Sequence, residues 1–151
     1  MCMHGGLSEE MHNRDFSWVE EAINSTVRPA EIPNSGLICD LLWADPDTRL
    51  STTVAANFPS FAKNDIRGVS VVFNSAAVRA FLNLNDFDLI VRAHECVEDG
   101  YLFFADRGLV TVFSAIDFCG EHNNSGAVLN IDNNMVCTFL VLAPTPSVKL
   151  S

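Results

Sequence analysis

The sequence predicts an α+β fold, with helices in the first part of the chain and antiparallel strands in the second. Before Leu89, apolar residues recur at helical spacing in separate segments. After it, β-branched and aromatic runs alternate with short turns, which is typical of a strand meander. The chain has 151 residues, of which 48% are hydrophobic, so it is long and apolar enough to bury one core.

The first predicted helix follows an N-terminal loop. Its apolar face is marked by residues at helical spacing, namely Phe16, Val19 and Ile23. Arg28-Pro29 is expected to close this helix, because proline cannot continue the hydrogen-bond ladder.

Two further helices are predicted downstream. Ser35 is expected to cap a short apolar helix that ends at Trp43, before the turn Ala44-Asp45-Pro46-Asp47. Ser75 is expected to cap the third helix. The intervening Leu50–Lys63 is rich in Ser, Thr, Ala and Asn, and is interpreted as a surface loop.

In the second part of the chain, the sequence predicts one strand followed by two hairpins. The first strand is Leu89–Ala93. Tyr101–Phe104 is expected to pair with Leu109–Ser114 through an Ala-Asp-Arg-Gly turn. Ala127–Ile131 is expected to pair with Met135–Leu142 through an Asp-Asn-Asn turn, which is a strong hairpin signal.

Charge and cysteine usage exclude several classes of protein. A formal net charge of −10 disfavours a nucleic-acid surface, which needs clustered Lys and Arg, and suits binding of a metal cation or a basic peptide as well as a simple acidic surface. The longest apolar runs are too short to cross a bilayer, and no signal peptide is visible. The cysteines are odd in number and widely spaced: Cys2, Cys39, Cys96, Cys119 and Cys137. They therefore predict free thiols and a cytoplasmic or nuclear location.

Two histidines are the candidate functional residues of this chain. His4 precedes two glycines, which allow the backbone to approach a ligand or to adopt a positive φ. His94 follows the apolar strand Leu89–Ala93 and stands directly before acidic residues. Each is a candidate metal ligand, although an ordinary loop histidine and a surface ion pair remain open alternatives.

Longer motifs accompany the two histidines in a fixed order. They are Gly36-Leu-Ile-Cys-Asp-Leu-Leu-Trp43-Ala-Asp45-Pro-Asp47, Arg67-Gly-Val-Ser70, Arg92-Ala-His94, Glu98-Asp99-Gly-Tyr101 and Ser114-Ala115 through Cys119-Gly-Glu121. On these motifs the chain resembles the C-terminal half of the phosphoprotein phosphatases, the metal-dependent Ser/Thr phosphatase family. The resemblance extends from Met3 to about Pro144. It implies that residues 1–151 are the C-terminal part of a single catalytic domain with an α/β/β/α metallophosphoesterase sandwich, whose N-terminal half is absent from this sequence.

The resemblance also implies a site and a reaction. Two cations, Mn²⁺ or else Fe or Zn, would activate a water that hydrolyses phosphoserine and phosphothreonine in phosphoprotein substrates. His4 and His94 match the two histidines that bind the second metal. Arg67 matches an arginine that grips the phosphate, for which the forked guanidinium is suited.

The sequence departs from the family pattern in three respects. The upstream motifs Gly-Asp-x-His, Gly-Asp-x-x-Asp-Arg-Gly and Gly-Asn-His-Glu, which carry the other metal ligands and the catalytic histidine, do not occur, so no catalytic residue is assigned in this chain. Ile66 is inserted before Arg67, and either turns that arginine away from the phosphate or is absorbed as a bulge. Phe118 stands where the family has a tyrosine, so a phenol is lost.

A second surface follows from the resemblance. Relatives bind regulatory subunits through a hydrophobic channel, in which a motif bearing Val and Phe adds as a strand. The matching positions here are apolar with a basic rim: Leu89, Phe103, Arg107, Val110, Val112, Leu129, Met135, Cys137 and Phe139. The same alternation is also expected of residues that simply face a core.

Three hypotheses therefore follow from the sequence. The chain is part of a protein Ser/Thr phosphatase whose activity is impaired or absent without the missing motifs. Alternatively, it is a non-catalytic module that binds phosphatase regulators. A third possibility is a truncated product that exposes a large apolar face and does not fold stably.

Overall fold

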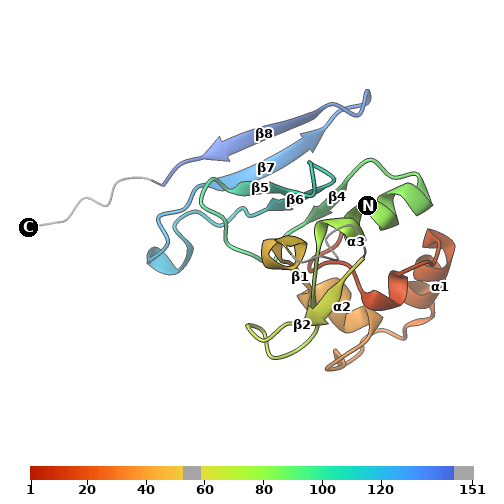
Figure 1. The fold of residues 1–151 in the computed structure, drawn as a ribbon. Helices are drawn as coiled ribbons and strands as arrows, with labels where there is room; N and C mark the ends of the chain where they lie inside the picture. Colours follow the sequence, from red (N-terminus) through yellow and green to blue (C-terminus); the bar gives the residue numbers. More distant parts are fainter. Residues whose placement is uncertain (53–58, 145–151) are drawn as a thin grey trace, which may run out of the picture. The chain divides into compact units, whose positions relative to one another are not determined.

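The computed structural model describes residues 1–52 and 59–144, which form two compact units (Figure 1). The first unit contains Met1–His94 and Phe103–Val110. The second contains Glu95–Leu102 and the chain from Thr111 onward. Helices and strands are both present, and the predicted α+β fold class is confirmed.

The three predicted α-helices are present, but two of the predicted caps are wrong. They are α1 (Phe16–Ser25), α2 (Leu37–Trp43) and α3 (Ser75–Asn85). Helix α2 starts after Gly36, which has a φ of 89° and provides no side-chain cap. Helix α3 is capped by Asn74, whose Oδ1 accepts a hydrogen bond from the amide of Ala77 at 3.0 Å. An amide side chain one residue earlier therefore takes the role that the sequence suggested for Ser75.

Three short 3₁₀ turns complete the helical structure: η1 (Glu9–Met11), η2 (Thr48–Thr52) and η3 (Phe118–Gly120). Ser8 caps η1, since its Oγ accepts a hydrogen bond from the amide of Glu10 at 3.3 Å.

The first unit contains a small mixed sheet that the sequence did not predict. Its strands are β1 (Asp45–Pro46), β2 (Phe61–Lys63) and β3 (Val71–Phe73), in the order β1-β3-β2. Strand β1 runs parallel to β3, whereas β2 is antiparallel to it. The interpretation of residues 61–63 as loop is therefore wrong, while residues 53–58 of that predicted loop lie outside the described residues. Strands of two or three residues show no alternation that a sequence could reveal.

The predicted strands of the second part are present with slightly different ends. Strands β4 (Ile90–Arg92), β5 (Tyr101–Phe104) and β6 (Leu109–Val112) form a sheet in the order β4-β6-β5. Strands β7 (Gly126–Ile131) and β8 (Cys137–Leu142) form the second hairpin, which Figure 1 shows as two long antiparallel arrows.

Asp132 organises the turn of the β7–β8 hairpin. Its Oδ1 accepts hydrogen bonds from the backbone amides of Asn134 at 2.8 Å and of Val136 at 2.9 Å. This local bonding satisfies backbone donors at the turn and sets the register in which Ile131 faces Cys137.

The hydrophobic core belongs to the first unit. It is built from α1, α2, α3 and the ends of β3, β4 and β6, and its buried members are Leu7, Met11, Val19, Leu37, Ala44, Phe73, Ala77, Val78, Phe81, Leu82, Ile90 and Leu109. This core fixes the elements that carry the two candidate histidines.

Candidate metal centre

The N-terminal segment runs beside β4 and carries His4 to His94. The carbonyl of Met1 accepts a hydrogen bond from the amide of Val91 at 2.9 Å, and the amide of Met3 donates to the carbonyl of Val91 at 3.0 Å. The carbonyl of His4 then accepts from the amide of Ala93 at 3.0 Å. This parallel pairing places two residues that are 90 positions apart side by side.

The two glycines after His4 permit a close backbone approach to α2. A Cβ atom at Gly5 would stand 2.5 Å from the carbonyl carbon of Leu42, and one at Gly6 would collide with the ring of Phe73. Both glycines are buried, and neither has a positive φ. The expectation of a positive φ is therefore wrong, and the close approach that these glycines allow within the protein is to helix α2 and to the ring of Phe73.

The two imidazoles face each other through one nitrogen each. Nε2 of His4 and Nδ1 of His94 are 3.2 Å apart, and the ring centroids are 5.0 Å apart. Two nitrogens at about 2.1 Å from a common divalent ion are about 3.0–3.4 Å apart for coordination angles between square and tetrahedral. The separation therefore fits two ligands of one metal ion, and in the metal-free protein it also fits a hydrogen bond between the two rings.

The surroundings of His94 keep its ring neutral. Its Nε2 is buried and has no hydrogen-bond partner among the described residues. The ring packs edge-on against Trp43, with centroids 5.2 Å apart. Burial is the main reason why the pKa of His94 falls from 6.5 to about 4, and the positive charge of Arg67 lowers it further. A neutral imidazole is the form that binds a metal ion.

A buried ion-pair network lies beneath the histidines. Arg92, whose side chain is fully buried, donates to Oδ1 of Asp45 at 2.7 Å and to the carbonyls of Gly5 at 2.7 Å and Ala44 at 3.0 Å. Its bond to Gly5 ties the loop that carries His4 to the strand that carries His94. A charged guanidinium is tolerated in such a position only because its donors and its charge are matched.

Asp45 is held from three sides. Its Oδ2 accepts hydrogen bonds from Asn64 and Arg67, each at 2.9 Å. Burial acts to raise the pKa of Asp45, but the hydrogen bonds from Arg67, Asn64 and Arg92 outweigh it and the pKa is lowered. Asp45 is thus an ionised anchor for both arginines and is not directed at a metal ion.

Arg67 lies beside the histidine pair despite the inserted Ile66. The amide of Arg67 donates a hydrogen bond to Oδ1 of Asn64 at 3.1 Å, and the amide of Gly68 donates to the carbonyl of Asn64 at 3.0 Å. These two bonds form a tight turn that contains the inserted Ile66. Ile66 itself is 79% exposed. Nη2 of Arg67 lies 3.5 Å from the carbonyl oxygen of His94. The structure therefore brings His4, His94 and Arg67 together in the first unit.

A third metal ligand is absent from this site within residues 1–52 and 59–144, where no group of three or more His, Cys, Asp or Glu side chains could hold an ion. The nearby acid Asp40 is also engaged, since its carboxylate accepts hydrogen bonds from Ser8 and Ser70, each at 2.6 Å. The pair fits a metal ion as two of its ligands, and further ligands have to come from elsewhere.

Sequence reasoning missed the supporting residues Asp40, Asp45 and Arg92. The signal was present in part, because all three residues lie inside the motifs on which the family resemblance rests. Their burial and their mutual bonding depend on tertiary contacts, which a local pattern does not encode.

The predicted docking residues divide between the two units. In the first unit, Val110 is fully buried and the Arg107 guanidinium lies over the ring of Phe103 at 5.1 Å. In the second unit, Met135 is 72% exposed, while the rings of Tyr101 and Phe139 are stacked at 4.0 Å. Leu89, Val112 and Leu129 are half-buried, whereas Cys137 is exposed.

The ring of Phe118 lies beside two other aromatic rings. It is 42% exposed and contacts Phe113 edge-on, with centroids 5.3 Å apart, and His122 at 5.8 Å. This agrees with a packing role for the ring that replaces tyrosine.

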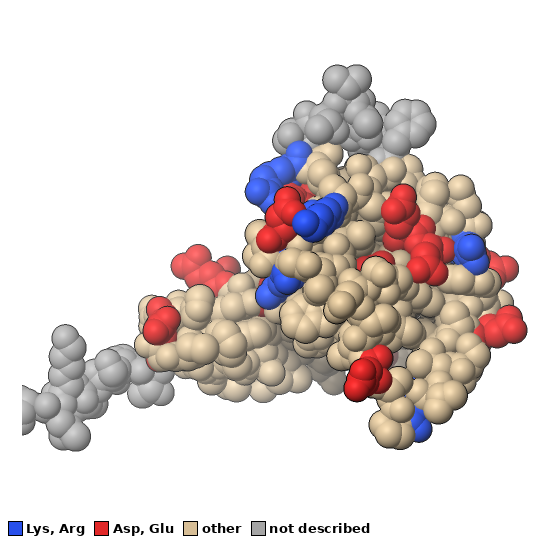
Figure 2. Space-filling view, turned by 90° about the horizontal axis from the view of Figure 1, so that it is seen from below, with Lys and Arg blue, Asp and Glu red and all other residues tan. Residues whose placement is uncertain are grey.

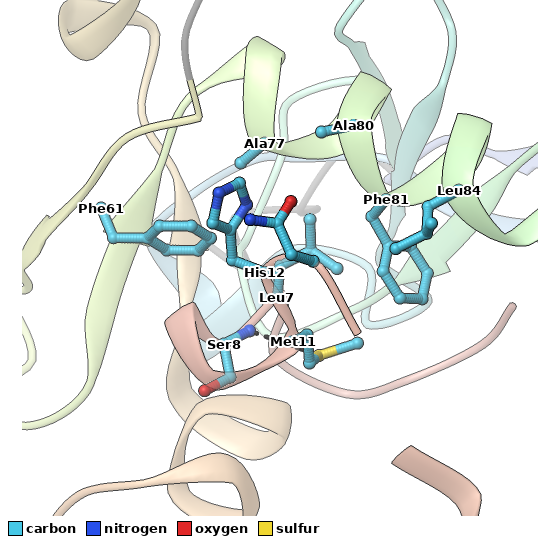
Figure 3. A pocket seen from close by; sticks show the side chains of 10 residues that line it. Leu7, Ser8, Met11, His12, Phe61, Ala77, Ala80, Phe81 and Leu84 are labelled. Carbon is cyan, nitrogen blue, oxygen red and sulfur yellow. Dashed lines mark hydrogen bonds between the residues drawn. The ribbon is translucent and has the colours of Figure 1, made fainter. Parts of the chain in front are cut away.

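The first unit also contains an apolar pocket of about 240 Å³, separate from the histidine pair. Figure 3 shows Phe81 and Leu84 of α3 on one side, Phe61 on the other, and the Leu7–Met11 segment below. On the face seen in Figure 2, acidic side chains are scattered in several places and do not form one continuous patch. Among the described residues, no helix has the length and hydropathy that a bilayer crossing demands.

Comparisons with known proteins agree with this architecture. Residues 1–98 match the family model described as calcineurin-like phosphoesterase. Among solved structures, the chain is similar to a protein serine/threonine phosphatase from Saccharomyces cerevisiae with similarity to human phosphatase PP5, with a TM-score of 0.74 and 23% sequence identity. The match covers 98% of this chain and 45% of that chain, so the present sequence spans less than half of that structure. At this identity the likeness concerns the fold.

Proposed function

Because this chain belongs to the calcineurin-like phosphoesterase family, we propose that it is a protein Ser/Thr phosphatase-like polypeptide that supplies part of a dinuclear metal site. The family and the fold of the yeast phosphatase support a phosphatase-like protein. We further propose a particular likeness to the protein phosphatase 1 catalytic subunit, and the proposed substrates are phosphoserine and phosphothreonine in proteins. We also propose that residues 1–151 are the C-terminal part of one catalytic domain, in the cytoplasm or nucleus.

The observation that carries the proposal is the facing pair of nitrogens in His4 and His94, 3.2 Å apart. When bound, two divalent ions, with Mn²⁺ as the first choice, would supply Lewis acidity and an activated water. His4 and His94 would hold one of these ions, and the neutral state of His94 would leave a lone pair for it. Arg67, whose Nε is anchored by Asp45, would bind phosphate oxygens with its other donors.

The proposal assigns the remaining chemistry to groups outside this sequence. Two imidazoles without a carboxylate form an incomplete shell for hard divalent ions. Activity therefore requires a polypeptide that carries the three upstream motifs, and the chain alone is expected to turn over little or no substrate.

The test is phosphate release from a phosphoserine peptide in Mn²⁺ buffer. The chain is assayed alone and with the N-terminal half of a related phosphatase that carries the three upstream motifs. Release that requires both polypeptides and is abolished by His94→Ala supports the proposal. Phosphate release that His94→Ala leaves unchanged contradicts the proposal. The absence of phosphate release also contradicts it, provided that the wild-type chain is shown to bind the added N-terminal half.

A second candidate function is a non-catalytic module for phosphatase regulators. It is favoured by the exposed Met135 and Cys137 and by the long edge strand β8, since a sheet edge can accept an added strand. A peptide with a Val-x-Phe motif should bind, and Phe139→Ala should weaken binding. A peptide in which both motif residues are alanine is the matched control, and equal binding of the two peptides ends this idea.

A further inference from the structure

We propose that a hollow in the first unit is a binding site for a phosphate-sized oxyanion, separate from the histidine pair. The hollow has a volume of about 430 Å³ and lies between the start of α3, the turn η2 and the turn that joins β5 to β6. The residues that define it are Thr48, Ser75, Arg79, Phe103, Asp106 and Arg107. This inference does not depend on the proposed phosphatase activity.

The two arginines give the hollow its chemistry. Arg79 lies one helical turn after Ser75 on α3, so the two residues share a face of the helix. The Arg107 guanidinium lies over the ring of Phe103, with its carbon 5.1 Å from the ring centroid. Stacking uses the face of a guanidinium and leaves the N–H donors at its edge available for a ligand. Two such forks and the hydroxyl of Ser75 are donors that match the oxygens of a phosphate group.

The hollow has one internal competitor for the anion. Asp106 contacts Arg79 at a nitrogen–oxygen distance of 3.5 Å, with side chains that are 41% exposed for the arginine and 91% exposed for the aspartate. An exposed pair with this long separation contributes little to stability. A doubly charged ligand can therefore displace the carboxylate of Asp106 from Arg79.

The backbone of the turn points to a function of this region. Ala105, Asp106 and Arg107 have φ values of 53°, 54° and 70°, so three consecutive residues that are not glycine adopt the left-handed conformation. Residues with side chains rarely adopt this conformation without strain, and strain of this kind concentrates at ligand sites. The strain is maintained in a turn that delivers one of the two arginines to the hollow.

The overall charge makes the local chemistry selective. The whole chain carries a formal net charge of −10, which repels anions from most of the surface. The three charged residues of the hollow sum to +1, from Arg79 and Arg107 against Asp106. Anion binding to this protein should therefore be confined to places such as this one, where paired donors outweigh the general repulsion.

The test is an NMR titration of the full chain with inorganic phosphate and with a phosphoserine peptide at low ionic strength. The unphosphorylated peptide is the control ligand. Saturable shifts are expected at Ser75 and Arg107. Arg79→Gln and Arg107→Gln should each weaken binding about ten-fold, because each removes a charge-assisted hydrogen bond. Asp106→Asn should strengthen binding several-fold, because it removes the competing carboxylate.

Two control variants separate this site from a general charge effect and from the candidate metal centre. Arg14→Gln makes the same charge change at an exposed arginine that stacks on Trp18, and should leave the affinity within about two-fold. Arg67→Gln tests the candidate metal centre and should leave the shifts at Ser75 intact. Equal losses for Arg79→Gln and Arg14→Gln, or loss only with Arg67→Gln, overturn the proposal. The relative affinity of free phosphate and phosphopeptide identifies which source of the oxyanion the site takes.

Discussion

At the scale of single residues, the candidate centre rests on buried polar contacts more than on the histidines themselves. Arg92 joins Asp45 to the carbonyl of Gly5, and Asp45 in turn holds Arg67. The fully buried guanidinium has no access to water that would replace a lost partner. The position of both histidines and the lowered pKa of His94 therefore depend on residues other than the histidines themselves.

Replacement of Arg92 by methionine should lower the free energy of unfolding by about 3–5 kcal/mol, because Asp45 and two carbonyls lose a buried donor. Urea unfolding followed by circular dichroism measures this change. Arg49→Met is the matched control, since Arg49 pairs with Asp47 on the surface with a side chain 77% exposed. Its effect should be much smaller than that of the Arg92 replacement, because solvent screens the exposed pair. Similar losses for the two variants would contradict the role given to Arg92.

The titration of His94 provides a pH-dependent prediction. Its pKa is about 4 in the folded chain and 6.5 without the fold, so the unfolded chain binds more protons between these values. The resulting stability is present above pH 6.5 and is lost as the pH falls toward 4. Urea unfolding of metal-free protein across this range should show a smaller slope against pH in His94→Gln than in the wild type. Identical slopes would mean that the imidazole titrates normally.

At the scale of elements, the sequence predicted those with a clear period and missed those without one. Helix α1 was predicted because its ten residues show an amphipathic pattern. The β7–β8 hairpin was predicted because two apolar runs flank a recognisable turn sequence. Strands β1, β2 and β3 are two or three residues long, and their pairing is set by contacts far apart in sequence. The same distinction holds for the site residues. The motifs identified His4, His94 and Arg67, whereas the hydrogen-bond network around Asp45 is visible only in the folded structure.

The loop between His4 and η1 is held by the close approach of two glycines. Gly6→Ala should destabilise the chain by about 1–3 kcal/mol, because the new methyl group collides with the ring of Phe73. The double variant Gly6→Ala with Phe73→Leu should lose less than the sum of the two single changes, as measured in a double-mutant cycle by thermal unfolding. Strict additivity would show that the collision is not the cause.

At the scale of the whole molecule, the second unit exposes many apolar side chains on one hairpin. Several residues of the β7–β8 hairpin and its turn are 43–72% exposed: Val128, Ile131, Met135, Val136, Leu140, Val141 and Leu142. Such surfaces, together with an open strand edge, favour association with other chains. This agrees with a polypeptide that spans less than half of the phosphatase structure it matches.

The exposed hairpin should make the isolated chain self-associate and bind a hydrophobic dye. Leu140→Lys places a charge on the outer strand β8, where the leucine is 62% exposed. Sedimentation velocity should show less association in this variant than in the wild type, with little change in thermal unfolding. Leu84→Lys, on α3 at 51% exposure, is the control. If both variants reduce association equally, general charge and not the hairpin is responsible.

The central claim is that His4 and His94 together bind one metal ion, and it is tested most directly by an Mn²⁺ titration of the chain. The electron paramagnetic resonance signal of free Mn²⁺ reports binding without any requirement for activity. His4→Ala and His94→Ala should each weaken binding at least about ten-fold, whereas His122→Ala, in the second unit, should not change it. Equal affinity of the wild type, His4→Ala and His94→Ala would contradict the claim.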